Sequence, residues 1–454
     1  MSSRIRFLLC FSLFFFAASK LLSQSADFGR PVGVLRIHVE ADSEKLCSSP
    51  FDAFDPSINF FLKDQMIGAS SPTQADQLKI WDGAMQNYKK AFLAGNTGDQ
   101  NKDGKWFKND ETWTPSDISI QAGMGFFIKN NQTAAQNVYL SGKLPMDSSR
   151  SLTLSPSLNL FAYPFSSSIN LNDSNLMLNG AKGGVDQNDS PDKISTASPV
   201  TLHWLLDNPV DPNHGKWLDS GNIPSVLKMG IGAAFWYERL GSGSFSWTEN
   251  RPYQNLFDLG ASCPAVTDIA FASGGTEAVL SIDCSGISGE TLEIFYKDLD
   301  ADEILQTESG WNIAAMGIET DSETEILWTD SGRVSAEFPF PSRPQISGIY
   351  SRIYMVSRED MDSDNDGLSN GSEKFVYGTD PLVYDSDGDG LSDGDEINVY
   401  HTDPNLVDSD GDGYSDFSEI NTWNTDPKNP ASNPTVMPAC WTDCDVGSPS
   451  RAGS

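Results

Sequence analysis

Basic residues are scarce in this sequence, and acidic residues outnumber them about two to one. The 454 residues include 30 Lys and Arg against 63 Asp and Glu, which gives a net charge of −33. Nucleic-acid phosphates and anionic membrane surfaces both attract clustered positive charge. We therefore expect no nucleic-acid partner and no adhesion to an anionic membrane.

The sequence also lacks the common catalytic signatures. It has only 4 histidines, and it contains no H-E-x-x-H, no G-x-S-x-G and no nucleotide-binding loop. His38, His203 and His214 stand in contexts that indicate no catalysis, and no two carboxylates stand out as a glycosidase pair. We therefore expect neither catalytic residues nor an organic cofactor, and we do not predict an enzyme.

Long hydrophobic runs are absent except near the N-terminus. There, Arg4 and Arg6 precede the apolar run Phe7–Ala18, and small and polar residues follow it. This order is typical of a secretory signal peptide, and the run is too short to span a membrane comfortably. We predict a signal peptide over residues 1–25, a secreted or extracellular location, and no membrane insertion after cleavage.

Cysteine is scarce as well, and five of the 6 cysteines follow the predicted signal peptide. None of the five forms a close Cys/His set of the kind that binds zinc. In an oxidising compartment, Cys263 with Cys284 and Cys440 with Cys444 can form disulfides, which leaves Cys47 unpaired. The spacing alone does not settle this pairing.

The acidic residues concentrate in residues 358–430, which carry about half of the net charge. Three segments there begin at Asp362, Asp385 and Asp408, 23 residues apart, and each matches D-x-D-x-[DN]-G-x5-E. A Thr-Asp-Pro marker after each segment keeps the same period. Three units in strict register predict calcium-binding loops and argue against a disordered acidic tail.

Calcium takes about six to eight oxygen ligands, and this pattern supplies them at fixed positions. Carboxylates at positions 1, 3 and 5, the backbone carbonyl at 7, the side chain at 9 and a glutamate at 12 surround the ion, because a glycine at position 6 permits a tight turn. The predicted ligands are Asp362, Asp364, Asp366, Leu368, Asn370 and Glu373; Asp385, Asp387, Asp389, Leu391, Asp393 and Glu396; and Asp408, Asp410, Asp412, Tyr414, Asp416 and Glu419.

What surrounds each loop differs from an ordinary EF-hand. No helix is expected before any loop, and after it only about one helical turn fits before a stop at Gly378, His401 or Asn424. The loops are therefore not predicted to form the two-helix sensor that opens on calcium binding. The segment from Asp362 to Pro430 resembles the thrombospondin type 3 repeat in its bacterial, cysteine-free form.

The resemblance implies structural calcium and a stiff, compact spacer on a secreted or cell-surface protein. Because the apolar support within the repeats is a thin line of residues, we expect this segment to unfold in chelator. The first loop, with the neutral Asn370 at position 9, is expected to bind calcium most weakly. Asp380, Asp403 and Asp426 either act as additional ligands or only cap turns.

The rest of the chain has the alternating, turn-rich pattern of β structure, so the predicted fold class is mainly β. Within residues 30–260, Gly104–Trp113 with Ala122–Asn130 resemble Gly215–Pro224 with Met229–Glu238, which predicts an internal duplication. Residues 265–357 predict an antiparallel β-sandwich. Its expected strands are Ala278–Cys284, Leu292–Asp298, Trp311–Met316, Glu325–Asp330, Val334–Phe338 and Arg352–Ser357. Two segments complete the chain: three EF-hand-like calcium loops without entering helices (358–430) and a tail (431–454).

These features favour a secreted or cell-surface structural or adhesive protein, in which calcium-stabilised repeats form a rigid spacer for β domains. Its expected partners are calcium and an extracellular glycan or surface protein. The main alternative is a carbohydrate-binding protein, because exposed aromatic rings stack on sugars. Candidate rings are those of Trp81, Trp106, Trp113, Trp217, Trp236 and Trp247. A secreted hydrolase is the less favoured alternative.

Overall fold

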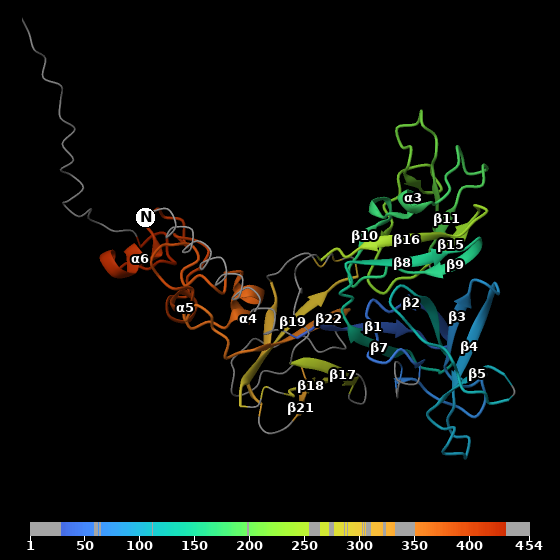
Figure 1. The fold of residues 1–454 in the computed structure, drawn as a ribbon, viewed down its shortest axis with the longest axis horizontal. Coiled ribbons are helices and arrows are strands. Elements are labelled where there is room, and N and C mark those ends of the chain that lie inside the picture. The colour runs from blue at the N-terminus through green and yellow to red at the C-terminus, as the bar shows by residue number, and fades with distance from the viewer. Residues whose placement is uncertain are drawn as a thin grey trace, which may run out of the picture. The chain divides into compact units, whose positions relative to one another are not determined.

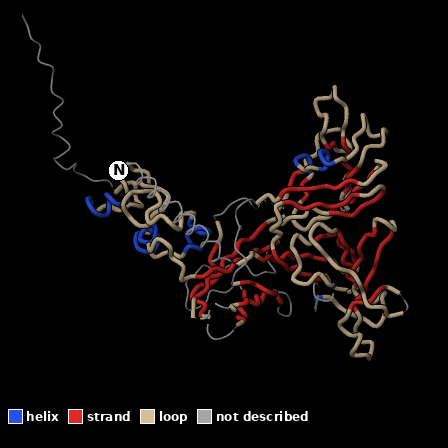
Figure 2. The backbone as a smooth tube through the Cα atoms, in the orientation of Figure 1, coloured by secondary structure: helices blue, strands red, loops and turns tan. Residues whose placement is uncertain are grey.

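The structure is a computed structural model that describes residues 29–432 apart from short gaps. The gaps are 59–61, 63–64, 111, 198, 254–263, 272–276, 286, 288, 302, 304, 306–309, 321–323 and 332–349. The predicted signal peptide, Cys263, Cys440, Cys444, the predicted strand Val334–Phe338 and residues 433–454 of the tail lie outside the described residues. The chain divides into two compact units, Met1–Glu359 and Asp360–Ser454. All described strands lie in the first unit, and short helical turns characterise the second (Figures 1 and 2).

Residues 32–143 of unit 1 contain a five-stranded antiparallel sheet and a strand pair. The sheet has the order β2-β6-β3-β4-β5. Its strands are β2 (Ser43–Ser48), β3 (Gln77–Asp82), β4 (Asn87–Leu93), β5 (Trp106–Lys108) and β6 (Gly125–Asn130). The pair consists of β1 (Val32–Val39) and β7 (Gln136–Lys143). Strand β1 buries Leu35 and Ile37 and exposes His38, as its alternating sequence predicts.

Residues 149–250 of unit 1 repeat this arrangement. Their sheet, read from β9, has the order β9-β15-β11-β12-β13, and their strand pair is β8 with β16. The strands are β8 (Ser149–Leu154), β9 (Ser157–Phe161), β11 (Lys193–Ser195), β12 (Leu202–Leu205), β13 (Trp217–Leu218), β15 (Phe235–Arg239) and β16 (Phe245–Asn250). Short elements between them are β10 (Ile169–Asn170), η2 (Leu171–Asp173), α3 (Leu176–Asn179) and β14 (Lys228–Met229).

Residues 32–143 and 149–250 also share local hydrogen bonds at their Gly-Lys-Trp segments. The Gly104 N–H donates to the Ala94 carbonyl and the Gly215 N–H to the Leu206 carbonyl, both at 2.9 Å. The tryptophan two residues after each glycine is 1% exposed and begins the equivalent strand, β5 or β13. The same order of strands with the same local bonds is the arrangement that a duplication produces.

Residues 265–357 contribute to an antiparallel β-sandwich, as predicted. One sheet has the order β17-β18-β21 and the other β20-β19-β22-β1-β7. The new strands are β17 (Ala265–Phe271), β18 (Ala278–Asp283), β19 (Thr291–Leu299), β20 (Asn312–Glu319), β21 (Glu325–Asp330) and β22 (Ser351–Arg358). Leu280 of β18, Ile294 of β19 and Val34 of β1 share one hydrophobic core. Strand β17 was not predicted, and β1 joins β22, so the predicted regions 30–260 and 265–357 share a sheet.

The described part of unit 2, residues 360–432, consists of three acidic loops, each followed by a short helical turn and none preceded by a helix (Figure 1). The turns are α4 (Asn370–Ser372) with η4 (Glu373–Tyr377), α5 (Asp393–Asp395) with η5 (Glu396–Tyr400), and α6 (Asp416–Ser418) with η6 (Glu419–Trp423). The turns end at Gly378, His401 and Asn424, with left-handed φ angles of 77°, 59° and 56°. These stops are the predicted ones.

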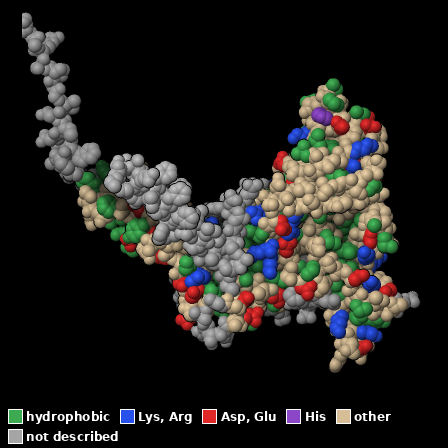
Figure 3. All heavy atoms as spheres, viewed as in Figure 1, with side chains coloured by type: hydrophobic (Ala, Val, Ile, Leu, Met, Phe, Trp, Pro, Cys, Tyr) green, Lys and Arg blue, Asp and Glu red, His purple; other side chains and the backbone are tan. Residues whose placement is uncertain are grey.

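Cys47 carries a free, buried thiol, as expected, and burial raises its pKa. Cys284 is buried too, but its proposed partner Cys263 lies outside the described residues, so that disulfide stays a prediction. In the part of the chain that the structure describes, no helix has the length and apolarity needed to cross a membrane. On the face drawn in Figure 3, acidic and basic side chains are interspersed over unit 1.

Candidate metal centre

The first acidic residue of each loop folds the backbone into a tight curl. In the second loop, the two carboxylate oxygens of Asp385 accept hydrogen bonds from the N–H groups of Gly388 (2.8 Å) and Gly390 (3.0 Å). Asp362 and Asp408 make the same pair of bonds in their loops. The position-6 glycines make the predicted tight turn with positive φ angles: 98° at Gly367, 112° at Gly390 and 99° at Gly413.

The curl brings the predicted acidic ligands of each loop together. The carboxylates at positions 1, 3 and 5 each offer an oxygen within 4.8 Å of the other two. The sets are Asp362, Asp364 and Asp366; Asp385, Asp387 and Asp389; and Asp408, Asp410 and Asp412. Three carboxylates this close repel one another unless a cation lies between them, so each set has the composition of a hard-cation site.

The glutamate at position 12 of each loop is fully buried. Glu373, Glu396 and Glu419 are each 0% exposed, and the Oε2 atom of each has no hydrogen-bond partner. In the first two repeats, the threonine of the Thr-Asp-Pro marker donates to the other oxygen, from Thr379 at 3.5 Å and from Thr402 at 3.1 Å. A buried carboxylate oxygen with no donor is costly, and a cation is the partner that its chemistry fits.

The electrostatics of the loops point the same way. Burial, and then repulsion from Asp364 and Asp366, raise the pKa of Glu373 to about 9. Burial, and then repulsion from neighbouring aspartates, raise the pKa of Glu396 to about 8. Burial is also the main cause that raises the pKa of Asp364 to about 6. Without a cation, Glu373 and Glu396 favour their protonated forms near neutral pH, so the geometry is one for ionised carboxylates around a positive charge.

The ligands predicted at position 7 are the backbone carbonyls of Leu368, Leu391 and Tyr414, and this role stays a prediction. The side chains of Leu368 and Leu391 are buried, at 6% and 5% exposed. In the third loop, the Tyr414 ring lies against Trp423, with ring centroids 6.1 Å apart. These three side chains therefore help to anchor their loops.

The residues at position 9 are buried but lie outside the acidic sets of their own loops. Asn370, Asp393 and Asp416 each accept a hydrogen bond from the backbone N–H of the serine at position 2, at 2.9, 2.8 and 3.0 Å. They therefore hold the start of their own loop in place. The structure groups Asp393 instead with Asp366 and Glu373 of the preceding repeat. Sequence reasoning missed this grouping.

For Asp380, Asp403 and Asp426, the structure shows the turn-capping role. Each side chain accepts a hydrogen bond from the backbone N–H two residues later, at 3.2, 3.1 and 3.2 Å. None of the three joins an acidic set among the described residues. Their alternative role as ligands stays a prediction.

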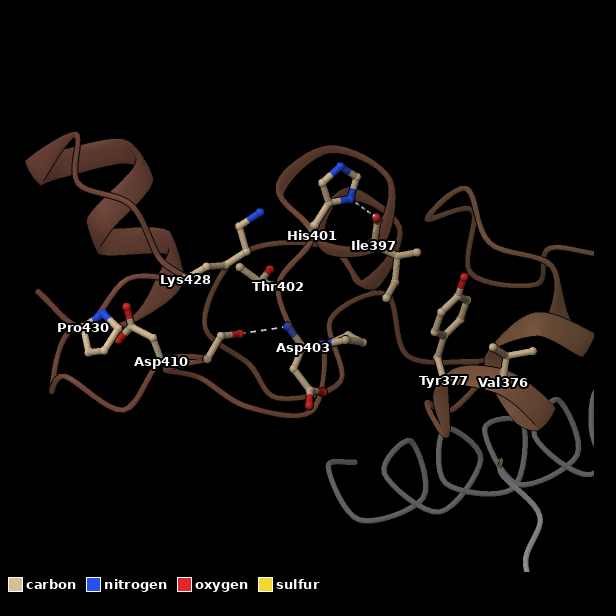
Figure 4. Close-up of a pocket in the computed structure, with 11 residues that line it drawn as sticks. Val376, Tyr377, Ile397, His401, Thr402, Asp403, Asp410, Lys428 and Pro430 are labelled. Carbon is tan, nitrogen blue, oxygen red and sulfur yellow. Dashed lines mark hydrogen bonds between the residues drawn. The ribbon is translucent and has the colours of Figure 1, made fainter. Parts of the chain in front are cut away.

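A separate surface groove of about 660 Å³ runs along the same repeats (Figure 4). Its lining includes Tyr377, Ile397 and Lys428, and Asp410 is the lining residue that also belongs to an acidic set. In the groove, the Asp403 N–H donates to the Ser409 hydroxyl at 2.8 Å. The groove therefore adjoins the third carboxylate set through Asp410.

Comparison with known proteins identifies this part of the chain. A family model described as the bacterial TSP3 repeat matches residues 362–383, 385–406 and 408–430. These bounds confirm the predicted resemblance and its period, and repeats of this type are calcium-binding and extracellular. No curated protein matches the chain.

Proposed function

Because residues 362–430 are three bacterial thrombospondin type 3 repeats, we propose that this chain is a secreted or cell-surface structural protein. In this proposal, its repeats fold around calcium and serve as a rigid spacer that presents the β-rich unit to a partner. The observation that carries the proposal is the buried glutamate that follows each aspartate set in the sequence, with a carboxylate oxygen that no donor satisfies.

In each loop, the aspartates at positions 1, 3 and 5 and the glutamate at position 12 would hold the ion. Bound calcium would neutralise their repulsion and join segments that have little else to bury. Among the described residues of unit 2, the buried hydrophobic side chains are those of Leu368, Phe375 and Leu391. Burying one such side chain contributes about 1.5–3 kcal/mol, which is too little for three of them to order a segment of this length.

Calcium titration calorimetry of the full chain tests the proposal. We expect calcium uptake by the wild-type protein and a loss of uptake in Asp385→Asn, because Asp385 belongs to a three-carboxylate set. Asp395→Asn is the matched control, since Asp395 is an exposed acidic residue of the same repeat that lies outside the sets. No uptake by the wild type, or equal losses in both variants, would contradict the proposal.

The proposed role is not catalytic. One buried carboxylate of unit 1, that of Glu249, is engaged in its core. Glu249, whose pKa is raised mainly by burial, accepts hydrogen bonds from the Trp247 indole (2.6 Å) and the Asn175 N–H (2.5 Å). A contact of this kind supports the fold and offers no group to a substrate.

Carbohydrate binding is the second candidate, and one aromatic cluster favours it. Trp81, Tyr88, Phe127 and Trp236 are half-buried where two sheets meet, and Trp81 lies 5.1 Å from Tyr88 and 5.3 Å from Trp236 between ring centroids. The candidates Trp106, Trp217 and Trp247 are each 1% exposed and belong to the core. Glycan-array binding that is lost in Trp236→Ala would favour this function, and an array with no binding would remove it.

A further inference from the structure

Adjacent repeats are joined by the same hydrogen bond at both junctions. The Gly394 N–H donates to Asp366 Oδ2 at 2.7 Å, and the Phe417 N–H donates to Asp389 Oδ2 at 2.8 Å. In both cases, position 10 of one repeat contacts the position-5 aspartate of the repeat before it. The carboxylate set of one loop is thus in direct contact with the next loop.

At the first junction, this contact brings a third carboxylate into the preceding repeat. Asp366, Glu373 and Asp393 each offer an oxygen within 4.8 Å of the other two. Glu373 is 0% exposed, and its Oε2 atom has no hydrogen-bond partner. Asp393 is also 0% exposed, and Ser386 fixes it through its N–H and its hydroxyl, at 2.8 and 2.6 Å.

The residue types at position 9 also indicate that this position serves the preceding loop. Position 9 is aspartate in the second and third repeats, each of which follows another repeat, and asparagine in the first, which does not. If position 9 served its own loop, Asn370 would be a missing charge in the first site. If it serves the preceding loop, Asn370 needs no charge.

We propose that the Asp393 carboxylate helps Asp366 and Glu373 to hold the cation of the first repeat, so that neighbouring repeats bind cations cooperatively. This inference rests on the proposed calcium function. Asp416 stands at the same sequence position after the second repeat; it is 0% exposed and its Oδ2 atom has no hydrogen-bond partner, although it completes no three-carboxylate set among the described residues. The family model matches no repeat after residue 430, and Asp412 Oδ2 lacks the N–H donor that its counterparts have. On this inference we expect the third site to bind calcium most weakly, and the weakest binding at the first site stays the alternative prediction.

Two reciprocal substitutions separate the two readings of position 9. Asp393→Asn gives the second repeat the side chain of the first, and Asn370→Asp does the reverse. The loop should tolerate Asp393→Asn, because Asn370 already makes the equivalent bonds to the N–H (2.9 Å) and hydroxyl (3.0 Å) of Ser363. Asp395→Asn removes the same charge from an exposed position and serves as the control.

The measurement is hydrogen exchange of the full chain, followed by mass spectrometry during a calcium titration, which reports on each loop separately. We expect Asp393→Asn to raise the calcium concentration that protects residues 362–377 by at least about tenfold. We expect Asn370→Asp to leave that concentration unchanged or higher. Full protection of both variants at saturating calcium shows that they fold.

Two results would overturn the inference: tighter calcium protection of residues 362–377 in Asn370→Asp, or an effect of Asp393→Asn confined to residues 385–400. Either result leaves the proposed calcium function intact, because the wild type still shows calcium-dependent protection. A wild-type chain without such protection anywhere would overturn the proposed function and this inference together.

Discussion

Replacing Gly394 by alanine tests whether the junction between the first two repeats stabilises the array. A Cβ atom at this position would lie 2.1 Å from the backbone carbonyl oxygen of Asp366, so the two repeats must move apart. The separation breaks the 2.7 Å bond from the Gly394 N–H to the Asp366 carboxylate. A hydrogen bond to a charged group contributes about 1.5–3 kcal/mol, which corresponds to about a tenfold to hundredfold change in an equilibrium constant.

We therefore expect Gly394→Ala to raise the calcium concentration that protects residues 362–400 from hydrogen exchange by about tenfold or more. Phe417→Ala is the matched control at the second junction, because it keeps the backbone N–H that binds Asp389. It removes a ring that is 39% exposed and should have the smaller effect. Equal protection curves for Gly394→Ala and the wild type would refute the role of the junction.

Three further predictions concern pH, the sandwich and the buried thiol. Because the pKa values of Glu373 and Glu396 are raised to about 9 and 8, the cation-free repeats bind protons that the unfolded chain releases above about pH 4–5. Any order that remains in chelator should therefore decrease as pH rises toward 8–9, whereas calcium affinity should rise with pH; titrations at pH 6 and 8 that give equal affinity would contradict this. Arg352→Met leaves the buried Asp330 carboxylate without the guanidinium that lies 2.8 Å away. Chemical denaturation in calcium should then show a loss of about 3–5 kcal/mol in the unfolding free energy. A loss well below this range would contradict the prediction. Cys47, with its raised pKa and 1% exposure, should resist alkylation until denaturant is added, and rapid labelling of the native protein would show that the site opens.

The loops were largely predictable because their information is local. Positions 1, 3, 5, 6 and 12 lie within one short segment, so the spacing alone predicted the converging aspartates and the tight turns at the glycines. The contact of Asp393 with Asp366 depends on how the repeats stack, which no single motif encodes. The one available signal was the change from asparagine to aspartate at position 9. In the sequence, the Thr-Asp-Pro marker indicated only the spacing of the repeats. In the structure, its threonine donates a hydrogen bond to the buried glutamate.

In unit 1, strands with continuous alternation were predictable and long-range pairing was not. Strand β17 escaped prediction because a register shift between Val266 and Asp268 interrupts its pattern. The pairing of β1 with β22 joins Val32 to Tyr354, residues at opposite ends of the unit. Such a pairing is decided by the shared core between the two sheets, since either strand could satisfy its hydrogen bonds with other partners.

Limited proteolysis of the full chain, with and without chelator, tests most directly whether cations hold the repeats together. Chymotrypsin has suitable targets in the array at Phe375, Tyr400 and Trp423. With calcium present, we predict no cleavage within residues 362–430; with chelator, we predict rapid cleavage there while unit 1 stays intact. Equal resistance of residues 362–430 in both conditions would contradict the account.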